Sequence, residues 1–220
     1  MKNLLYIIMA LVLMSFSGKE KEKTLVITTK YGTIKVRLYN ETPKHRDNYV
    51  KLAQEHFFDS LMFHRCIKDF MIQGGDPDSK HAKPGVQLGE GGLKYTIPAE
   101  IQPNLFHKYG VIAAARDNNP EKASSSSQFY IAVGKVYTDA QLTQMEQQTG
   151  KKFTDEERKA YTTIGGIPHL DGNYTVFGEV YEGMNLVDSI IKQPTDHNNR
   201  PLVDIRMEIT VGKDYKVKKK

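Results

Sequence analysis

The sequence has no tryptophan and only one cysteine, Cys66, in a chain of 220 residues. A single thiol excludes an intramolecular disulfide framework and any zinc or iron–sulfur site that needs several cysteines. The seven histidines lack the paired spacing of a metal motif, so we interpret each as a surface or structural residue. The serine run from Ser124 to Ser127 lies outside a G-x-S-x-G turn and predicts a flexible polar loop. We therefore expect no metal, no cofactor and no hydrolytic chemistry.

A large excess of charge of either sign is also missing. The 31 basic and 26 acidic residues give a net charge of +5, which is weak for a nucleic-acid-binding protein, and we expect no nucleic-acid partner. The apolar share of 39% is typical of a globular chain, and the length allows one generous domain or two small ones. Lysines gather in residues 18–23, expected to be a solvated charged leader, and in residues 213–220, expected to be a disordered basic tail. Docking of that tail on an anionic surface is the alternative interpretation.

The only long apolar run is at the N-terminus. Residues 1–17 combine a basic start, an apolar run from Leu4 to Met14, and small residues at Ser15 and Ser17, which is the pattern of a secretory signal peptide. The run is shorter than the roughly 20 residues that span a bilayer. We expect cleavage before Gly18 and an exported chain, periplasmic or secreted, without stable membrane insertion. An uncleaved N-terminal anchor is the alternative.

Residues 24–212 have the pattern of a domain rich in short strands. Alternating apolar residues predict a β-hairpin over 25–38, and Thr42-Pro43 predicts the start of an amphipathic helix over 43–56. A short helix is expected at 184–191. Further strands are expected within 61–73, near 95–100, and at 111–115, 128–133, 175–181 and 203–211. Many short strands with few helices predict a closed antiparallel barrel and not βαβ units.

A different pattern occupies residues 138–164. Two capping boxes, Thr138-x-x-Gln141 and Thr154-x-x-Glu157, each predict a helix start. The first helix is expected to end at Gly150. This segment predicts a helical hairpin, inserted over about residues 134–168. Its expected packing face consists of Leu142, Met145, Phe153, Tyr161 and Ile164.

Arg65 is the candidate functional residue that remains. Side chains alternate faces along a strand, so Arg65 should share a face with Phe63 and Ile67. An arginine is seldom buried without a partner, so a purely structural Arg65 would need Asp69 or Asp76 beside it. The pattern alone leaves a functional site and an incidental core arginine equally open. Cys66, inside the same apolar segment, is expected to be a buried, inert thiol.

Two further pairs of side chains are expected to share a strand face in this region. Met71 and Gln73 form one pair, and Gln128 and Tyr130 form the other. Phe129 should then point into the core.

The string FHRCIKDFMIQGGD closely resembles the central motif of the cyclophilin-type peptidyl-prolyl cis-trans isomerases. Three more segments resemble family motifs in the family's order: GVIAAAR, SSSSQFYI and LDGNYTVFGEVYEGMNLVD. The resemblance covers residues 24–212. It implies a mainly β fold, a closed eight-stranded antiparallel barrel with capping helices, to which this chain adds the helical hairpin. It also implies peptidyl-prolyl cis-trans isomerase activity, here on exported proteins.

The resemblance further implies roles for individual residues. Arg65 matches the catalytic arginine, which donates to the prolyl nitrogen. The implied substrate-binding residues are Phe70, Met71, Tyr130 and Leu170 in the proline pocket, Gln73 and Gln128 as backbone-holding amides, Ala115 and Arg116 as the peptide-pairing edge, and His169 and Tyr174 at the rim.

Four rim and pocket positions depart from the family pattern. Arg116 stands where many eukaryotic members have Asn, Tyr130 where Phe is usual, His169 where Trp or Phe is frequent, and Tyr174 where many have His. These departures affect peptide preference more than the reaction, and the missing indole N–H predicts weak cyclosporin binding. We expect a monomer with proline-containing polypeptides as clients. The alternative function is a binding module or holdase chaperone of the same fold with incidental catalysis.

Overall fold

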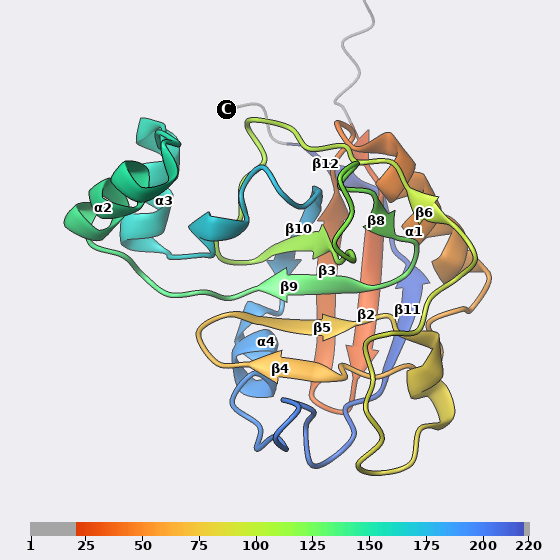
Figure 1. Ribbon diagram of the computed structural model, residues 1–220. Helices are drawn as coiled ribbons and strands as arrows, with labels where there is room; N and C mark the ends of the chain where they lie inside the picture. Colours follow the sequence, from red (N-terminus) through yellow and green to blue (C-terminus); the bar gives the residue numbers. More distant parts are fainter. Residues whose placement is uncertain (1–20, 218–220) are drawn as a thin grey trace, which may run out of the picture.

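The computed structural model describes residues 21–217, and the predicted signal segment 1–17 lies outside them. Its centre is a single antiparallel sheet with the strand order β11-β2-β3-β10-β7-β9-β5-β4 (Figure 1). The eight strands are β2 (Thr24–Thr29), β3 (Gly32–Leu38), β4 (Arg65–Ile67), β5 (Met71–Gly74), β7 (Val111–Ala114), β9 (Phe129–Ala132), β10 (Val176–Glu182) and β11 (Met207–Val211). The number of strands and their antiparallel pairing agree with the prediction.

The predicted closure of the sheet into a barrel is not observed. The sheet is open and strongly curled, with β11 and β4 as its two edges. Between these edges the chain makes only scattered backbone bonds, including Phe63 N–H to the Ile205 carbonyl at 2.9 Å and Met207 N–H to the Leu61 carbonyl at 2.8 Å. Met62 forms one isolated antiparallel bridge with Arg206, but this pairing does not continue into β4, where Cys66 N–H donates to the Asn199 carbonyl at 2.8 Å. The expectation of a closed barrel is therefore wrong.

The core lies inside the curl of the sheet. On β2 and β3 the buried residues alternate, and the register pairs Leu25 with Val36 and Ile27 with Ile34. Stacked and edge-on aromatic rings fill the centre, including Tyr49, Phe58, Phe129 and Phe177. Phe129 is fully buried, as the alternation predicts, and Cys66 is a buried free thiol.

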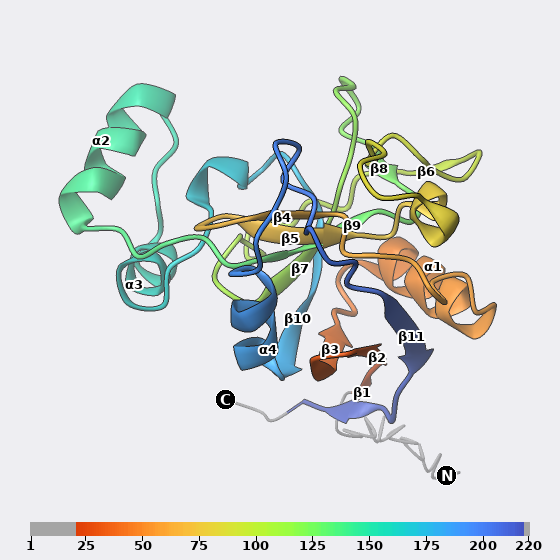
Figure 2. The same ribbon diagram turned by 90° about the horizontal axis from the view of Figure 1, so that it is seen from below.

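Two helices pack against the main sheet, α1 (Pro43–Gln54) and α4 (Met184–Ile190) (Figure 2). The predicted start of α1 is correct, but Thr42 makes no side-chain cap. The carboxylate of Glu100 accepts instead from the backbone N–H of Lys44 at 3.0 Å and of His45 at 2.9 Å. None of the helices within residues 21–217 is long and apolar enough to cross a membrane.

The predicted helical hairpin is present as α2 (Asp139–Thr149) and α3 (Asp155–Thr163), each with its capping box. Gly150 ends α2 with φ +73°, a conformation that favours glycine. The hairpin extends to one side of the sheet (Figures 1 and 2). Its small core joins Leu142, Phe153 and Tyr161 to Phe106 of the rest of the domain. Ile164 was expected in this core but is 50% exposed, because it comes after the last turn of α3.

Two small sheets correct three expectations. β1 (Lys21–Glu22) pairs with β12 (Tyr215–Lys216), so the parts of the expected leader and disordered tail that the structure describes are ordered against each other. β6 (Thr96–Ile97) pairs with β8 (Ser124–Ser125), and Ser124, Ser126 and Ser127 are buried. The serine run is therefore a packed segment and not a flexible loop. The remaining elements are the short 3-10 helices η1 (Pro77–His81) and η2 (Pro168–Leu170).

Candidate active site

A pocket of about 140 Å³ opens on the outer face of β4, β5 and β9, beside η2. Nine residues line it, and the family resemblance predicts a site role for each of them: Arg65, Phe70, Met71, Gln73, Ala115, Arg116, Tyr130, Leu170 and Tyr174. Two assigned residues, Gln128 and His169, do not line this pocket and lie next to it.

Strand register explains why these side chains meet. Arg65 pairs with Gln73 across β4 and β5, and Gln73 pairs with Tyr130 across β5 and β9. Paired residues point to the same face of a sheet, so all three project outward. Their neighbours Cys66 and Ile72 point into the core. Phe63 does not share the face of Arg65 as expected, because β4 begins at Arg65 and Phe63 packs in the core.

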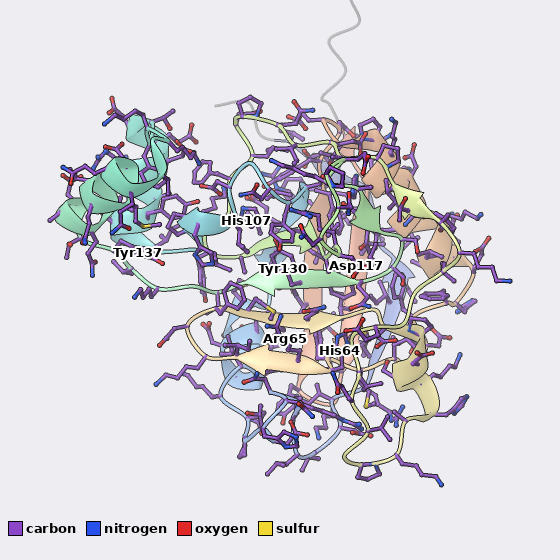
Figure 3. The ribbon with its side chains drawn as sticks, in the orientation of Figure 1. His64, Arg65, His107, Asp117, Tyr130 and Tyr137 are labelled. Atoms are coloured by element: carbon purple, nitrogen blue, oxygen red, sulfur yellow. The ribbon has the colours of Figure 1, made fainter. Side chains whose placement is uncertain are left out.

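Arg65 is half-buried and forms no ion pair among the described residues (Figure 3). Its Nη1 donates to Oε1 of Gln73 at 3.2 Å. Burial lowers the pKa of Arg65 and the neighbouring Tyr174 acts to raise it, but an arginine stays protonated near neutral pH. Neither Asp69 nor Asp76 is its partner: Asp69 is an exposed turn residue, and Asp76 accepts from the backbone of η1 and of Gly89. The arginine therefore has free donors that face the pocket.

A chain of amides runs from Arg65 into a second hollow. Gln73 Nε2 donates to Gln128 Oε1 at 2.9 Å, and Gln128 Nε2 donates to the carbonyls of Gly89 at 2.8 Å and Gly91 at 2.7 Å. Gln128 thereby lines a neighbouring hollow of about 310 Å³, which shares Gln73, Ala115 and Arg116 with the first. The hydrogen-bonded pair of Gln73 and Gln128 therefore connects the two hollows.

Gly89 and Gly91 were not recognised from the sequence. Gly89 has φ +111°, and a Cβ on Gly91 would lie 2.1 Å from the Asp76 carboxylate. The sequence feature that could have pointed to them is the Gly-rich segment from Gly89 to Gly92. Its role in holding Gln128 cannot be read from the sequence, because Gln128 lies far along the chain.

The pocket walls are apolar or aromatic. Met71 and Tyr130 are buried at its base, whereas Phe70, Leu170 and Tyr174 are partly exposed. Burial raises the pKa of the Tyr130 hydroxyl well above its ordinary value, so Tyr130 stays neutral. These side chains form the apolar part of a lining that also includes Arg65, Gln73 and Arg116.

The rim carries the residues that depart from the family pattern. His169 is exposed at the surface but stacks on Phe70 with ring centroids 5.7 Å apart, and the partial burial of its ring lowers its pKa. Arg116 lies over the ring of Tyr174 at 4.9 Å and donates to the Asn173 carbonyl at 2.8 Å. Tyr174 and the Asn173 carbonyl thus hold the guanidinium of Arg116 at the rim.

The edge beside the pocket is partly occupied. The backbone N–H of Ala115 donates to the Gln128 carbonyl at 2.9 Å, and its own carbonyl accepts from Ser125 at 2.8 Å. Arg116 makes no backbone–backbone hydrogen bond within residues 21–217. Its backbone is the free part of this edge. No group of three or more His, Cys, Asp or Glu side chains in the described part of the chain is arranged to hold a metal ion.

Comparison with known proteins identifies the family. The family described as "Cyclophilin type peptidyl-prolyl cis-trans isomerase/CLD" matches residues 24–211. A Staphylococcus aureus protein, provisionally named a peptidyl-prolyl cis-trans isomerase, is 31% identical over 194 residues, which cover 86% of this chain and 91% of that protein. Peptidyl-prolyl cis-trans isomerase-like 1 of Neurospora crassa is 30% identical and covers 83% of this chain and 90% of its own length.

A solved structure has the same fold. The cyclophilin-type isomerase of Cryptosporidium parvum gives a TM-score of 0.65 at 24% identity and covers 88% of this chain and 98% of its own. The chain therefore belongs to the cyclophilin-type peptidyl-prolyl cis-trans isomerase family. It is an enzyme of the peptidyl-prolyl cis-trans isomerase class.

Proposed function

We propose that this chain accelerates rotation about Xaa-Pro bonds of exported polypeptides, with Arg65 as the donor to the prolyl nitrogen. The observation that carries the proposal is Arg65 itself. It is half-buried at a pocket of about 140 Å³, held by the amide of Gln73 and not by a carboxylate. A donor with unused N–H groups beside an apolar ring-sized pocket is the arrangement that the reaction requires.

The reaction makes few chemical demands. The barrier to rotation comes from amide resonance and is about 18–20 kcal/mol. Breaking that conjugation needs no nucleophile and no bond cleavage. It needs a donor to the prolyl nitrogen as that atom loses its conjugation and becomes pyramidal. Because an arginine remains protonated near neutral pH, the catalysed rate should be flat across that range.

The donor supplies only a part of the acceleration. A charge-assisted hydrogen bond formed in the transition state contributes about 1.5–3 kcal/mol, or roughly 10- to 150-fold in rate. The rest is assigned to the walls formed by Phe70, Met71, Tyr130 and Leu170, which hold the proline ring away from water. Holding one side of the bond allows the other side to rotate against it.

The amides and the free edge are proposed to hold the substrate backbone. Gln73 and Gln128 are linked to each other at 2.9 Å, and because Gln128 donates both of its N–H groups to Gly89 and Gly91, the second N–H of Gln73 is assigned to the substrate and Gln128 holds Gln73 in place. The Ala115 backbone is already bonded, so peptide pairing is assigned to the Arg116 backbone. A second structure of the Cryptosporidium parvum relative, with a TM-score of 0.64, was determined in the presence of the dipeptide Ala-Pro, which supports a proline-containing peptide as ligand.

Rim chemistry sets the expected ligand preferences. His169 and Tyr174 flank the pocket without an indole donor, which supports weak cyclosporin binding. A nanomolar inhibition constant for cyclosporin would contradict this part of the proposal.

Export is proposed from residues 1–17 alone. Their basic start, apolar run and small residues before Gly18 have the pattern of a cleaved signal. Expression of the whole chain followed by N-terminal sequencing of the exported fraction should find a new terminus near Gly18. Recovery of Met1 on the exported protein would contradict cleavage.

The isomerase activity is tested by adding the purified protein to a peptide containing a cis Xaa-Pro bond. The cis-to-trans relaxation should become faster in proportion to enzyme concentration. A relaxation equal to the uncatalysed rate at all enzyme concentrations would refute the proposed function.

A further inference from the structure

A buried chain of hydrogen bonds runs from the α2–α3 hairpin to the base of the proline pocket. Tyr161 of α3 donates its hydroxyl to Asp171 Oδ2 at 2.7 Å. Asp171 Oδ1 lies 2.9 Å from His107 Nδ1, and His107 Nε2 lies 2.9 Å from the Tyr130 hydroxyl. All four residues are buried, and Figure 3 shows His107 beside Tyr130. The hairpin is thus connected to a side chain that lines the pocket.

Asp171 is the acceptor at the centre of this chain of hydrogen bonds. Asp171 also accepts from the backbone N–H of His107 at 2.8 Å. Burial acts to raise the pKa of Asp171, but the His107 ring and backbone and the Tyr161 hydroxyl outweigh it and lower the pKa, so Asp171 is ionised. Nδ1 of His107 donates to this carboxylate, and Nε2 of the same ring is hydrogen-bonded to the Tyr130 hydroxyl. Each group in the chain has a partner that fixes its orientation.

The hairpin supplies a second contact to the same carboxylate. Lys151, in the loop between α2 and α3, lies 3.0 Å from Asp171 Oδ2 and 3.3 Å from Glu157. Its side chain is 37% exposed, so solvent screens this contact more than it screens the Tyr161 bond. Tyr161 is therefore the principal hairpin residue that acts on Asp171.

Backbone bonds hold the base of the hairpin against the same histidine. Ile167 N–H donates to the His107 carbonyl at 2.8 Å, and Tyr109 N–H donates to the Gly165 carbonyl at 3.0 Å. A Cβ on Gly166 would lie 2.2 Å from the His107 carbonyl, so only glycine allows this approach. Beyond this point the chain enters η2, where Leu170 lines the pocket.

We infer that the inserted hairpin is a positioning element of the proline pocket: Tyr161 holds Asp171, which orients His107, which fixes the ring of Tyr130. Without this chain the hydroxyl of Tyr130, which is only 4% exposed, would lose its buried partner and would have to move to find another. The ring is part of the wall that holds proline, so its movement weakens substrate binding. The inference deepens the proposed isomerase function and rests on it.

The test is Tyr161→Phe, which removes one hydroxyl from the hairpin and keeps its aromatic core. The KM for a proline peptide should rise by about 3- to 10-fold with a smaller fall in kcat, since the Tyr130 ring holds proline in the ground state and is also assigned a part of the acceleration. The matched control is Tyr137→Phe. The Tyr137 ring packs edge-on against Tyr161 with centroids 6.4 Å apart, and its hydroxyl has no hydrogen-bond partner within residues 21–217. The control should leave both constants unchanged.

A double substitution separates this role from general loosening of the fold. In a protein that already carries Tyr130→Phe the chain is cut at the pocket, so adding Tyr161→Phe should change KM less than twofold. An equal KM for Tyr161→Phe and the control, or a full additional rise in the double variant, would overturn the inference.

A direct readout keeps the inference distinct from the proposed function. The ¹⁵N resonance of His107 Nε2 reports the bond to Tyr130 whether or not the protein is active. Tyr161→Phe should shift this resonance, and Tyr137→Phe should not. If the wild type shows no isomerase activity, the proposed function fails, and an unshifted resonance then overturns the coupling as well.

Discussion

Arg65 uses one of its donors on an amide oxygen and keeps the others for the pocket. A carboxylate partner would have held the guanidinium in a strong bidentate pair and removed it from the reaction. Gln73 at 3.2 Å orients the group without neutralising it. The proposed function therefore depends on Gln73 being a weak partner of Arg65, because a carboxylate would compete with the substrate for the guanidinium.

Cys66 is the neighbour of Arg65 and should be chemically silent. Its side chain is buried, and burial raises the pKa of the thiol to about 12. The thiolate is the reactive form, so at pH 8 the folded protein should react with iodoacetamide far more slowly than the protein in denaturant. Equal rates for folded and unfolded protein would show that the thiol is accessible.

Strand alternation predicted much at the scale of single residues. It placed Phe129 and Cys66 in the core, and the family motifs named the nine residues that line the pocket. It could not name the partner of Arg65, because Asp69, Gln73 and Asp76 all follow it within 11 residues and only the turn at Asp69 decides the register. His107 and Asp171 were missed for the same reason, since their contacts join segments that are 64 residues apart.

At the scale of elements, features formed by residues close in sequence were predicted correctly, and features that depend on residues far apart in sequence were not. Both capping boxes of the hairpin form as their sequences predict, since each joins residues three positions apart. The start of α1 was predicted correctly with the wrong cap, because the carboxylate that caps it comes from Glu100. The pairing of β1 with β12 joins the two ends of the described chain and has no local signature.

Glu100 should therefore matter to α1 more than any residue of the helix's own first turn. Its carboxylate accepts two backbone N–H groups and lies 2.7 Å from His45 Nδ1. We expect Glu100→Ala to lower the free energy of unfolding by about 2 kcal/mol in denaturant titrations. The control is Glu55→Ala at the exposed end of α1, which should cost less than about 0.5 kcal/mol. Equal losses would show that Glu100 does not cap the helix.

On the scale of the whole molecule, the number of strands and their antiparallel pairing were predictable, and the closure of the barrel was not. The number of strands follows from apolar runs and turn residues along the chain. Closure depends on whether the pairing of residues 60–63 with 205–207 continues into β4, and it stops at the isolated bridge between Met62 and Arg206. The length of such a pairing has no signal in the apolar pattern.

The stability of the whole protein should respond to acid through Glu179. Burial acts to raise the pKa of this carboxylate, but Lys108, Arg37 and the Tyr39 hydroxyl outweigh burial and lower it to about 2. A lowered pKa stabilises the fold at neutral pH, and that contribution is lost as the pH falls from about 4.5 to about 2. The contribution is at most on the order of 3 kcal/mol.

Glu179→Gln tests this dependence. The variant should be less stable than wild type at pH 7, and the difference in unfolding free energy should narrow as the pH falls toward 2. Glu208→Gln, at an exposed position on β11, is the control and should follow the wild type throughout. A difference between Glu179→Gln and wild type that stays constant with pH would contradict the assignment.

The central claim is that Arg65 carries the catalytic donor, and kcat/KM on a cis-proline peptide tests it most directly. Arg65→Ala should lower kcat/KM by roughly 10- to 150-fold and leave the melting temperature close to that of wild type. Arg206→Ala is the matched control, because Arg206 is exposed and donates to the Ser60 and Lys80 carbonyls away from the pocket. Its kcat/KM should equal that of wild type. A folded Arg65→Ala protein with wild-type kcat/KM would contradict the account.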